Sequence, residues 1–275
     1  MSEVLSVYAL GNTDAEHERL ARQAAIYDPL TERLFREAGI GTGQRVLDIG
    51  SGAGDVALLL ARLVGPSGTV VGLERSRDSI NRARSRVADA GLTNVTFIES
   101  DVGQIPAGDP FDAAVGRLIL MFLPEPVSVV RPLSKAVRPG GVVAFHEPSW
   151  VLMLERSQNL PLCVAALSVL RGSLERTGAN PEMGFELYNV FQKAGLPAPK
   201  MRLEVPVADH AGFARWVGDT VLSVRPYIDK LGLSSQALGD LSTLGARLHE
   251  EVTASDSAVA WLALVGAWAP VEVTL

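Results

Sequence analysis

The chain has 275 residues, 47% of them hydrophobic and 20% charged, so it is long and apolar enough to build a sizeable core. Its formal net charge of −6 argues against a nucleic-acid partner, because nucleic-acid-binding proteins usually carry a basic surface. The single cysteine, Cys163, excludes an internal disulfide framework and a cysteine-rich zinc site.

The first residues of the chain, from Met1 to Tyr8, lack the basic and apolar regions of a signal peptide. The longest uncharged apolar stretch, residues 258–271, is shorter than a membrane span. We therefore expect a cytoplasmic protein that has no membrane partner.

Residues 13–38 are predicted to form a helix, because apolar residues recur on one face and Gly39 and its neighbours end the pattern. A short apolar strand, residues 46–49, follows and leads into three glycines at alternate positions: Gly50, Gly52 and Gly54. Glycine tolerates positive φ and has no Cβ, so such a turn lets a ligand approach the backbone and the N–H groups of the next helix, residues 56–63.

The glycine spacing does not fit a nicotinamide cofactor. The dinucleotide fingerprint requires a third glycine at its sixth position, where this chain has Asp55. An additional acid, Asp48, precedes the first glycine by two residues and gives the form D-x-G-x-G-x-G.

Two more predicted strands end in acidic residues. Residues 69–74 end at Glu74, about 20 residues beyond the glycines, where a βαβ unit places its ribose-binding carboxylate. Residues 94–101 end at Asp101, which Val102 follows. A fourth strand covers residues 111–117, and the breaker sequence 138–141 precedes a fifth, 142–145. This alternation predicts a parallel sheet with helices on both faces.

After Pro148 the alternation lapses. Residues 151–178 are predicted to form one helical segment, 185–194 a helix, 201–207 a sixth strand, and 210–254 helix broken near 232–235. A final strand is expected within 260–271.

The acids, the glycine turn and the Arg-Pro-Gly-Gly sequence 138–141 together resemble the class I S-adenosylmethionine-dependent methyltransferases, over roughly residues 15–150. More loosely, the chain is similar to the small-molecule branch, which includes ubiquinone/menaquinone-biosynthesis and natural-product-tailoring enzymes. The resemblance implies an α/β fold with a Rossmann-like, mostly parallel seven-stranded sheet, an antiparallel last strand and a helical cap.

We expect one methyltransferase domain, since no linker divides the chain. It is predicted to consist of an N-terminal helical lid (1–43), a cofactor-binding core (44–147), two cap insertions (148–184 and 208–256), and the remaining core helix and strands (185–207 and 257–275).

In the family the second acid, here Glu74, holds the ribose hydroxyls, and the third, here Asp101, contacts the adenine amino group. The glycine turn suits the carboxylate of S-adenosylmethionine, and carbonyl groups near Gly50 and Arg117 suit its ammonium group. Asp48 either contacts the cofactor or hydrogen-bonds the glycine turn. The full predicted cofactor-binding set is Gln23, Asp48, Gly50, Ser51, Gly52, Gly54, Glu74, Arg75, Asp101, Val102 and Arg117.

The pattern Glu16-x-x-Arg19-x-x-x-Gln23 resembles one in tailoring methyltransferases, where the arginine and glutamine face the methionine end of the cofactor and a tyrosine, here Tyr8 or Tyr27, shields the methyl group. An ordinary amphipathic helix with solvated charges explains the same pattern.

Three residues are candidates for catalysis. His146, at the end of the fifth strand, and His210, at the start of a later helix, are candidate general bases. Glu147 is a candidate for orienting an amine or hydroxyl acceptor. A buried, hydrogen-bonded structural role is the alternative for His146, and His17 and His249 are expected to be solvated.

The sequence therefore predicts an S-adenosylmethionine-dependent methyltransferase that acts on an oxygen or nitrogen atom of a small lipophilic metabolite in secondary metabolism. Catechol-type methyltransferases bind magnesium through paired acids and an asparagine near strands four and five; this sequence does not resemble them in that respect, so we expect no metal. The alternatives are a quinone-type C-methyltransferase, and a cyclase or binding protein that keeps the fold without transferring methyl. The apolar segment 162–170 suits a lipophilic substrate, ordinary core or a homodimer interface.

Overall fold

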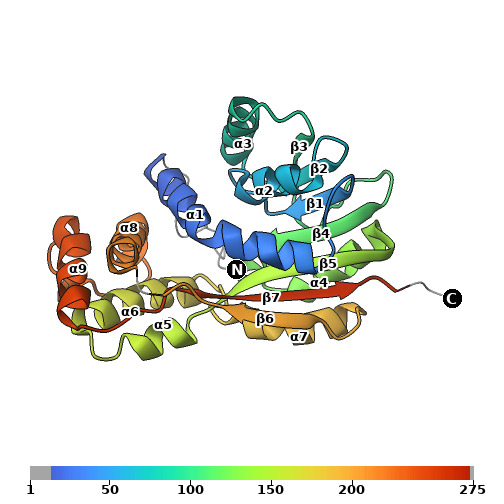
Figure 1. The fold of residues 1–275 in the computed structure, drawn as a ribbon. Helices are drawn as coiled ribbons and strands as arrows, with labels where there is room; N and C mark the ends of the chain where they lie inside the picture. The colour runs from blue at the N-terminus through green and yellow to red at the C-terminus, as the bar shows by residue number, and fades with distance from the viewer. Residues whose placement is uncertain (1–13, 208, 273–275) are drawn as a thin grey trace. The chain divides into compact units, whose positions relative to one another are not determined.

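The computed structural model of the protein describes residues 14–207 and 209–272. Within them, seven strands form one sheet in the order β3-β2-β1-β4-β5-β7-β6 (Figure 1). The strands are β1 (Arg45–Ile49), β2 (Thr69–Glu74), β3 (Val95–Glu99), β4 (Phe111–Arg117), β5 (Val137–Ser149), β6 (Lys200–Glu204) and β7 (Ala263–Pro270).

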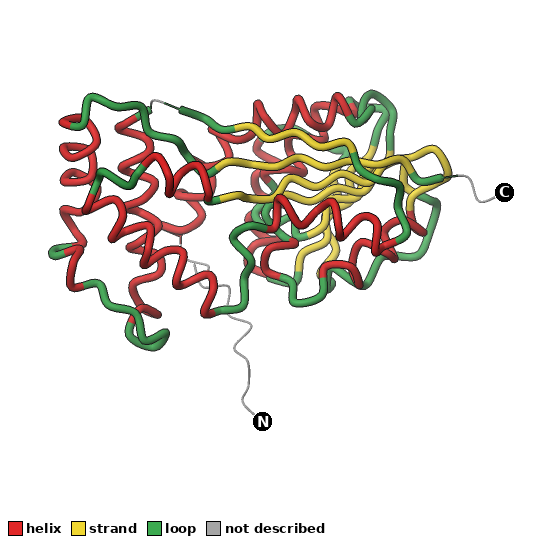
Figure 2. The backbone as a smooth tube through the Cα atoms, turned by 90° about the horizontal axis from the view of Figure 1, so that it is seen from below, coloured by secondary structure: helices red, strands yellow, loops and turns green. Residues whose placement is uncertain are grey.

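Helices connect the strands, except that a loop joins β3 to β4; Figure 2 shows the helices beside the sheet. The α-helices are α1 (Asp14–Glu37), α2 (Asp55–Val64), α3 (Arg77–Asp89), α4 (Pro126–Ala136), α5 (Val151–Arg156), α6 (Pro161–Arg176), α7 (Met183–Ala194), α8 (His210–Ile228) and α9 (Leu244–Ala254). Short 3-10 turns are η1 (Leu120–Phe122), η2 (Gln236–Leu238) and η3 (Leu241–Thr243).

The sheet is mostly parallel. β1 pairs in parallel with β2 and β4, β2 with β3, and β4 with β5. β7 runs antiparallel to β5: beside the start of β5 and the end of β7, the Gly140 N–H donates to the Val271 carbonyl and the Val271 N–H donates to the Gly141 carbonyl, each at 2.8 Å. The predicted fold class, with its antiparallel last strand, is confirmed; β7 lies between β5 and β6.

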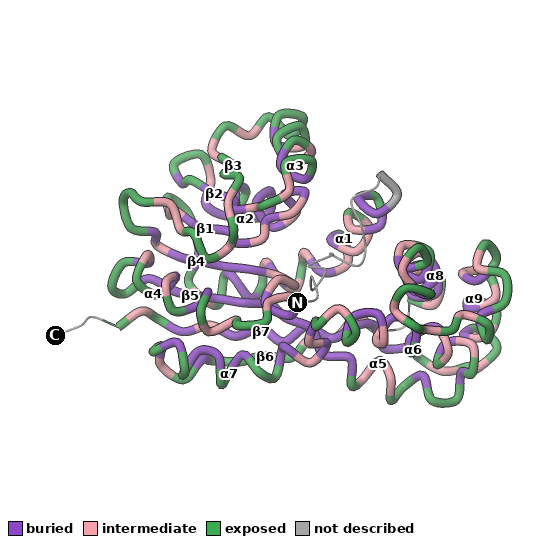
Figure 3. Tube along the Cα trace, turned by 180° about the vertical axis from the view of Figure 1, so that it is seen from behind, coloured by how far each residue is buried: buried purple, intermediate pink, exposed green. Residues whose placement is uncertain are grey.

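Both faces of the sheet are covered. On one face, alternate strand residues such as Val46 and Val115 join a core with the end of α1, with α2 and with α3. On the other face, Phe145 of β5 meets Phe191 of α7 edge to face at 6.2 Å, and α7 packs on α4. Figure 3 shows β4, β5 and β7 as largely buried. Strands buried on both faces are typical of a parallel sheet, which explains their continuous apolar sequences.

The contacts divide the chain into two compact units. Of the described residues, the first unit contains 14–23, 148–182, 204–207 and 209–264, and the second contains 24–147, 183–203 and 265–272. The second unit holds the glycine turn and the greater part of the sheet. The first holds most of the two segments predicted to form a cap, and their covering of a substrate stays a prediction.

The first unit has its own core. Helix α8 packs on α6 and on α9, and Trp261 lies against Phe213 and Trp216 of α8, with ring centroids 6.0 and 6.1 Å apart. Throughout the described part of the chain, no helix combines the length and apolar character that crossing a bilayer requires.

Some predicted boundaries were wrong. The single helix expected over 151–178 is two helices, α5 and α6, because Pro161 starts α6 and leaves Leu160 extended at φ −117°. The third strand ends at Glu99, so Asp101 lies in the loop beyond it. The fifth strand begins at Val137 and therefore includes the 138–141 sequence that was expected to precede it.

Candidate functional site

The glycine turn connects β1 to α2 at the carboxyl edge of the sheet, next to the place where the strand order reverses between β1 and β4. Ligands of open α/β sheets bind in the crevice at such a point. Gly50, Gly52 and Gly54 have φ values of +64°, +53° and +87°, a left-handed conformation that L side chains rarely adopt. This conformation explains why the turn needs all three glycines.

The three glycines differ in what surrounds them. A Cβ on Gly50 would lie 2.5 Å from the Ile119 side chain, and one on Gly54 would lie 3.1 Å from Ala83. A Cβ on Gly52 would meet no atom of the described residues within 4 Å. The backbone at Gly52 is therefore open, as close approach of a ligand requires.

Glu74, at the end of β2, lies beside this turn. Its Oε2 accepts a hydrogen bond from the Gly52 N–H at 3.0 Å, and its Oε1 accepts one from the Ser76 N–H at 2.8 Å. The structure therefore brings the predicted ribose acceptor and the predicted carboxylate-binding turn together.

Asp48 and Ser51 contribute buried polar atoms to the same place. Within the described residues, neither Oδ2 of Asp48 nor Oγ of Ser51 has a hydrogen-bond partner. Burial raises the pKa of the Asp48 carboxyl to about 8, opposed by the Arg117 charge and assisted by Glu74 and Asp55. A cationic ligand would favour its ionised form, so Asp48, Ser51 and the open Gly52 fit the predicted S-adenosylmethionine, which carries an ammonium and a sulfonium.

Asp55 and Arg86 brace the start of α2. The Asp55 carboxylate lies in the first turn of the helix, where its charge is favoured, and accepts a 2.6 Å hydrogen bond from Arg86 of α3. Arg86 also donates to the Ala53 carbonyl at 2.7 Å. Sequence reasoning missed Arg86, whose only signal was its place in the helix after β2.

The other predicted adenosine contacts lie further along the same edge. Arg75 follows Glu74 and is exposed, Asp101 is exposed two residues past β3, and Val102 is half-buried. The Ser100 N–H donates to the Glu74 carbonyl at 3.0 Å, which keeps the start of this loop next to β2. The adenine role of Asp101 stays a prediction.

Arg117 and His146 form a second group of polar residues with α1. Arg117 and His146 are direct partners in the β4/β5 register. Arg117 donates to Asp28 Oδ1 at 2.8 Å and to Thr31 Oγ1 at 3.0 Å, and Thr31 Oγ1 lies 3.1 Å from His146 Nδ1. Helix α1 thus supplies two residues to this edge, Asp28 and Thr31, that sequence reasoning missed.

His146 is neutral in this setting. It is 1% exposed, and burial, followed by the Arg117 charge, lowers its pKa to about 3. The Thr31 hydroxyl also donates to the Tyr27 carbonyl at 3.0 Å, so it is free to accept from a proton on His146 Nδ1. That tautomer leaves Nε2 with the lone pair, which a general base requires.

Glu147 is completely buried and hydrogen-bonded to the backbone. Its Oε1 accepts from the N–H groups of Ile119 and Leu120, at 3.0 and 2.9 Å, and its Oε2 from that of Met121, at 3.2 Å. Burial raises its pKa to about 7, against the lowering effect of these three donors. A contact between Glu147 and the methyl acceptor stays a prediction.

Gln23 and His210 belong to the first unit and not to the unit of the glycine turn. Gln23 Oε1 accepts from Arg19 Nη1 at 2.9 Å and from Trp216 Nε1 at 2.8 Å. His210 begins α8 and is half-buried. Their roles stay predictions, and Tyr8 lies outside the described residues.

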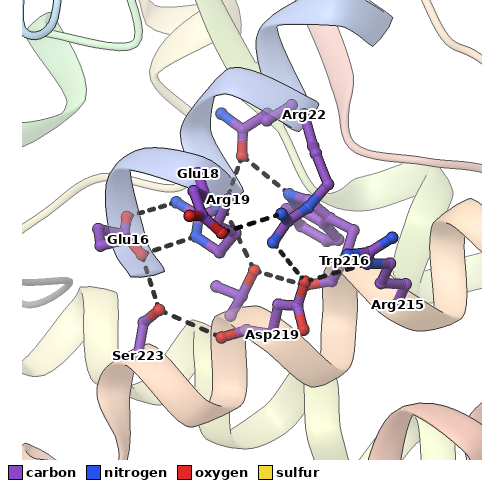
Figure 4. A network of polar contacts seen from close by, with 10 residues as sticks. Glu16, Glu18, Arg19, Arg22, Arg215, Trp216, Asp219 and Ser223 are labelled. Atoms are coloured by element: carbon purple, nitrogen blue, oxygen red, sulfur yellow. Dashed lines mark hydrogen bonds and ion pairs between the residues drawn. The ribbon is translucent and has the colours of Figure 1, made fainter. Parts of the chain in front are cut away.

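Glu16 and Arg19 form a buried ion pair, with exposures of 1% and 3% (Figure 4). Arg19 binds both Glu16 oxygens at 2.7 and 2.8 Å, and Ser223 of α8 donates to Glu16 Oε2 at 2.7 Å. The alternative of solvated charges at Glu16 and Arg19 does not hold. The expectation that His17 is solvated was wrong, since it is 8% exposed, whereas His249 is exposed as expected. Trp216, Thr220 and Ser223 lie one helical turn apart on α8 and hydrogen-bond to Gln23, Arg19 and Glu16. This spacing of polar groups on α8 was the sequence signal for the buried pair that the prediction missed.

Across the described residues, no three His, Cys, Asp or Glu side chains gather closely enough to hold a metal ion. The groups present at the crevice are hydrogen-bond acceptors and backbone N–H groups, which suit binding of a polar ligand, and one neutral imidazole, which suits proton transfer.

Comparison with known proteins agrees with this geometry. Residues 40–195, more than half of the chain, match a family model described as a methyltransferase domain. An arsenite methyltransferase of Halobacterium salinarum is 34% identical over 167 residues, covering 57% of this chain and 41% of the relative. The ubiquinone/menaquinone biosynthesis C-methyltransferase UbiE of Pseudomonas fluorescens is 33% identical over 121 residues, covering 42% and 47%. The chain thus spans less than half of the length of these relatives.

Among solved structures, the YcgJ protein of Bacillus subtilis superimposes with a TM-score of 0.57 at 15% identity, covering 90% of this chain and 98% of YcgJ. At that identity the likeness concerns the fold alone.

Proposed function

The chain belongs to the methyltransferase-domain family, the class I S-adenosylmethionine-dependent methyltransferases of small-molecule type, and we propose that it methylates an oxygen or nitrogen atom of a small lipophilic metabolite. S-adenosylmethionine is the cofactor of this family. One observation carries the proposal: the open left-handed Gly52 is hydrogen-bonded to Glu74 at the carboxyl edge of the sheet, beside buried atoms of Asp48 and Ser51 that have no hydrogen-bond partner among the described residues.

The cofactor-binding residues would be those of the crevice. The backbone of Gly50–Gly54 and the start of α2 would hold the carboxylate, Asp48 the ammonium, Glu74 the ribose and Asp101 the adenine. When bound, S-adenosylmethionine would supply a sulfonium methyl group: an oxygen or nitrogen lone pair can bond to the methyl carbon while the carbon–sulfur bond breaks and the neutral thioether leaves. The chain contributes orientation, since holding the reacting groups at near-attack distance accounts for much of such an acceleration.

His146 is the proposed general base for a hydroxyl acceptor. Its neutral ring, tied through Nδ1 to Thr31, would accept the acceptor's proton at Nε2. Because its pKa of about 3 keeps His146 neutral above pH 5, the ionisation of His146 should contribute no change in the rate of transfer between pH 6 and 8. His146→Ala should lower turnover by about 100-fold or more while the protein stays folded. A loss of thermal stability alone would assign His146 a structural role.

A C-methyltransferase of quinone type is the second candidate, because the relative from Pseudomonas fluorescens carries that name. The lipophilic substrate, the place in secondary metabolism, the cytoplasmic location and a homodimer remain part of our proposal from the sequence.

Calorimetry with S-adenosylmethionine and with its demethylated product tests the binding claim. We expect both to bind, and equal, negligible heats would overturn the proposal. Incubation with methyl-labelled cofactor and a panel of hydroxyl, amine and quinone metabolites then identifies the acceptor atom. A ring-closed, unlabelled product would instead identify a cyclase.

A further inference from the structure

The loop that follows β4 turns sharply at the edge of the crevice. The Leu118 N–H donates to the His146 carbonyl at 3.0 Å, which is the last contact of the ladder between β4 and β5. Leu118 then adopts a φ of +54°, a left-handed conformation that is strained for leucine, and η1 begins two residues later. A strained residue persists only where the surrounding structure holds it.

The Glu147 carboxylate provides that restraint. It accepts from three consecutive N–H groups, those of Ile119, Leu120 and Met121. The first N–H groups of a helical turn have no partner within the turn, and the residue before η1 caps it with no side-chain hydrogen bond. Glu147 thus fixes the position of this short segment from the neighbouring strand.

Ile119 carries the effect of this restraint to the glycine turn. Its Cδ1 and Cγ1 atoms occupy the space that a Cβ on Gly50 would need, at 2.5 Å, and its Cγ2 occupies the corresponding space at Gly116, at 2.8 Å. The Ile119 side chain therefore packs directly on the backbone of β4 and on the first glycine of the turn. Any shift of the 119–121 segment must move this contact.

We propose that Glu147 is a positioning residue, which holds Ile119 against Gly50 and so keeps the glycine turn in the conformation that binds S-adenosylmethionine. This inference rests on the proposed function for its ligand and on the described contacts for its geometry. Oε1 of Glu147 already accepts two backbone hydrogen bonds and Oε2 accepts one, so most of its acceptor capacity is used to hold the 119–121 segment. Glu147 therefore acts on the cofactor site through Ile119.

Amide hydrogen exchange tests the restraint without any ligand. In Glu147→Gln, the N–H of Met121 faces an amide NH₂ in place of a carboxylate oxygen. We expect the amides of residues 119–121 to exchange about tenfold faster than in the wild type, and those of Gly50–Gly54 to lose protection with them. Unchanged exchange at the glycine turn would overturn the proposal whether or not the protein binds S-adenosylmethionine.

Calorimetry at pH 8 tests the consequence for binding. Glu147→Gln and Ile119→Ala should each weaken S-adenosylmethionine binding about tenfold, and the double variant should be no weaker than the worse single one, because both changes act on one contact. Losses that multiply in the double variant would show that the two residues act independently, and affinity unchanged in Glu147→Gln would also overturn the proposal.

Glu251→Gln is the matched control. The Glu251 carboxylate likewise accepts from two backbone N–H groups, those of Leu162 and Cys163 at 2.8 and 2.9 Å, but at the start of α6. It should leave cofactor affinity and the exchange of the glycine turn unchanged. If the wild type fails to bind S-adenosylmethionine, the proposed function fails, while the exchange data still decide the role of Glu147.

Discussion

The Gly52 N–H donates a 3.0 Å hydrogen bond to the Glu74 carboxylate, and the same carboxylate accepts from the Ser76 N–H. One side chain therefore connects the turn after β1 to the turn after β2. A ligand held by Glu74 is also placed next to the open backbone of Gly52.

Replacing Gly52 separates backbone strain from ligand exclusion. Gly52→Ala should cost about 1 kcal/mol in the free energy of unfolding, because φ is +53°, and should also abolish most cofactor binding by placing a methyl group in the open space. Gly91→Ala is its control, with φ of +66° and no atom of the described residues within 4 Å of an added Cβ. Urea unfolding should give similar losses for both, and calorimetry a binding loss for Gly52→Ala alone.

Asp48 should make the unliganded protein less stable at alkaline pH. Its folded pKa of about 8 lies above the ordinary value of 3.8, so its contribution to stability is fully present below about pH 4 and is lost as the pH rises through 8. The raised pKa of Glu147 likewise lowers the free energy of unfolding as the pH rises to about 7. The lowered pKa of His146 has the opposite effect, because it makes the free energy of unfolding rise with pH, but only below about pH 6.5.

The free energy of unfolding should therefore fall between pH 6.5 and 8, by at most about 1.4 kcal/mol per pH unit for each group. Asp48→Asn should flatten this decline, as measured by urea unfolding at each pH. An equally steep decline in Asp48→Asn would contradict the assignment to Asp48.

Thr31 should be required to hold His146 and Arg117 in place. Thr31→Val removes the hydroxyl that both contact and should cost about 1–3 kcal/mol in the free energy of unfolding, because it leaves buried polar groups without partners. Thr31→Ser should restore most of the loss. Ser168→Ala, which removes an exposed hydroxyl on α6, is the control and should cost less than about 0.5 kcal/mol.

The Glu16–Arg19 pair should behave as a buried ion pair. Arg19→Ala removes the positive charge beside the buried Glu16 carboxylate and should cost about 3–5 kcal/mol. Arg22→Ala breaks the more exposed pair with Asp219 and should cost less than about 1 kcal/mol. Thermal unfolding of the two variants measures the difference, and similar costs would mean that burial of the pair contributes little.

Sequence reasoning located the glycine turn and the strands β2 and β4 because their signals are local. A continuous apolar run that ends in an acid, or three glycines at alternate positions, defines its own conformation. The bounds of β2 and β4 match the prediction residue for residue. The signal for the break at Leu160 was also local, because Pro161 follows it. The prediction nevertheless placed a single helix across this position.

The contacts of α1 could not be predicted in the same way. Thr31 lies 115 positions from its partner His146, and Arg19 lies 201 from Thr220. A helical pattern shows which face of α1 is apolar, but it does not show which distant strand or helix meets that face. The charges of Glu16 and Arg19 also suggested solvent exposure, because such residues are rarely buried unless they are paired.

The position of β7 affects the order in which the sheet is completed. β6 is synthesised before β7, yet β7 lies between β6 and β5. On the ribosome, β5 and β6 therefore emerge with their facing edges unpaired and must wait for the last strand to join them. Unpaired strand edges promote aggregation, so the interval between the synthesis of β6 and that of β7 is the stage at which this nascent chain depends most on chaperones.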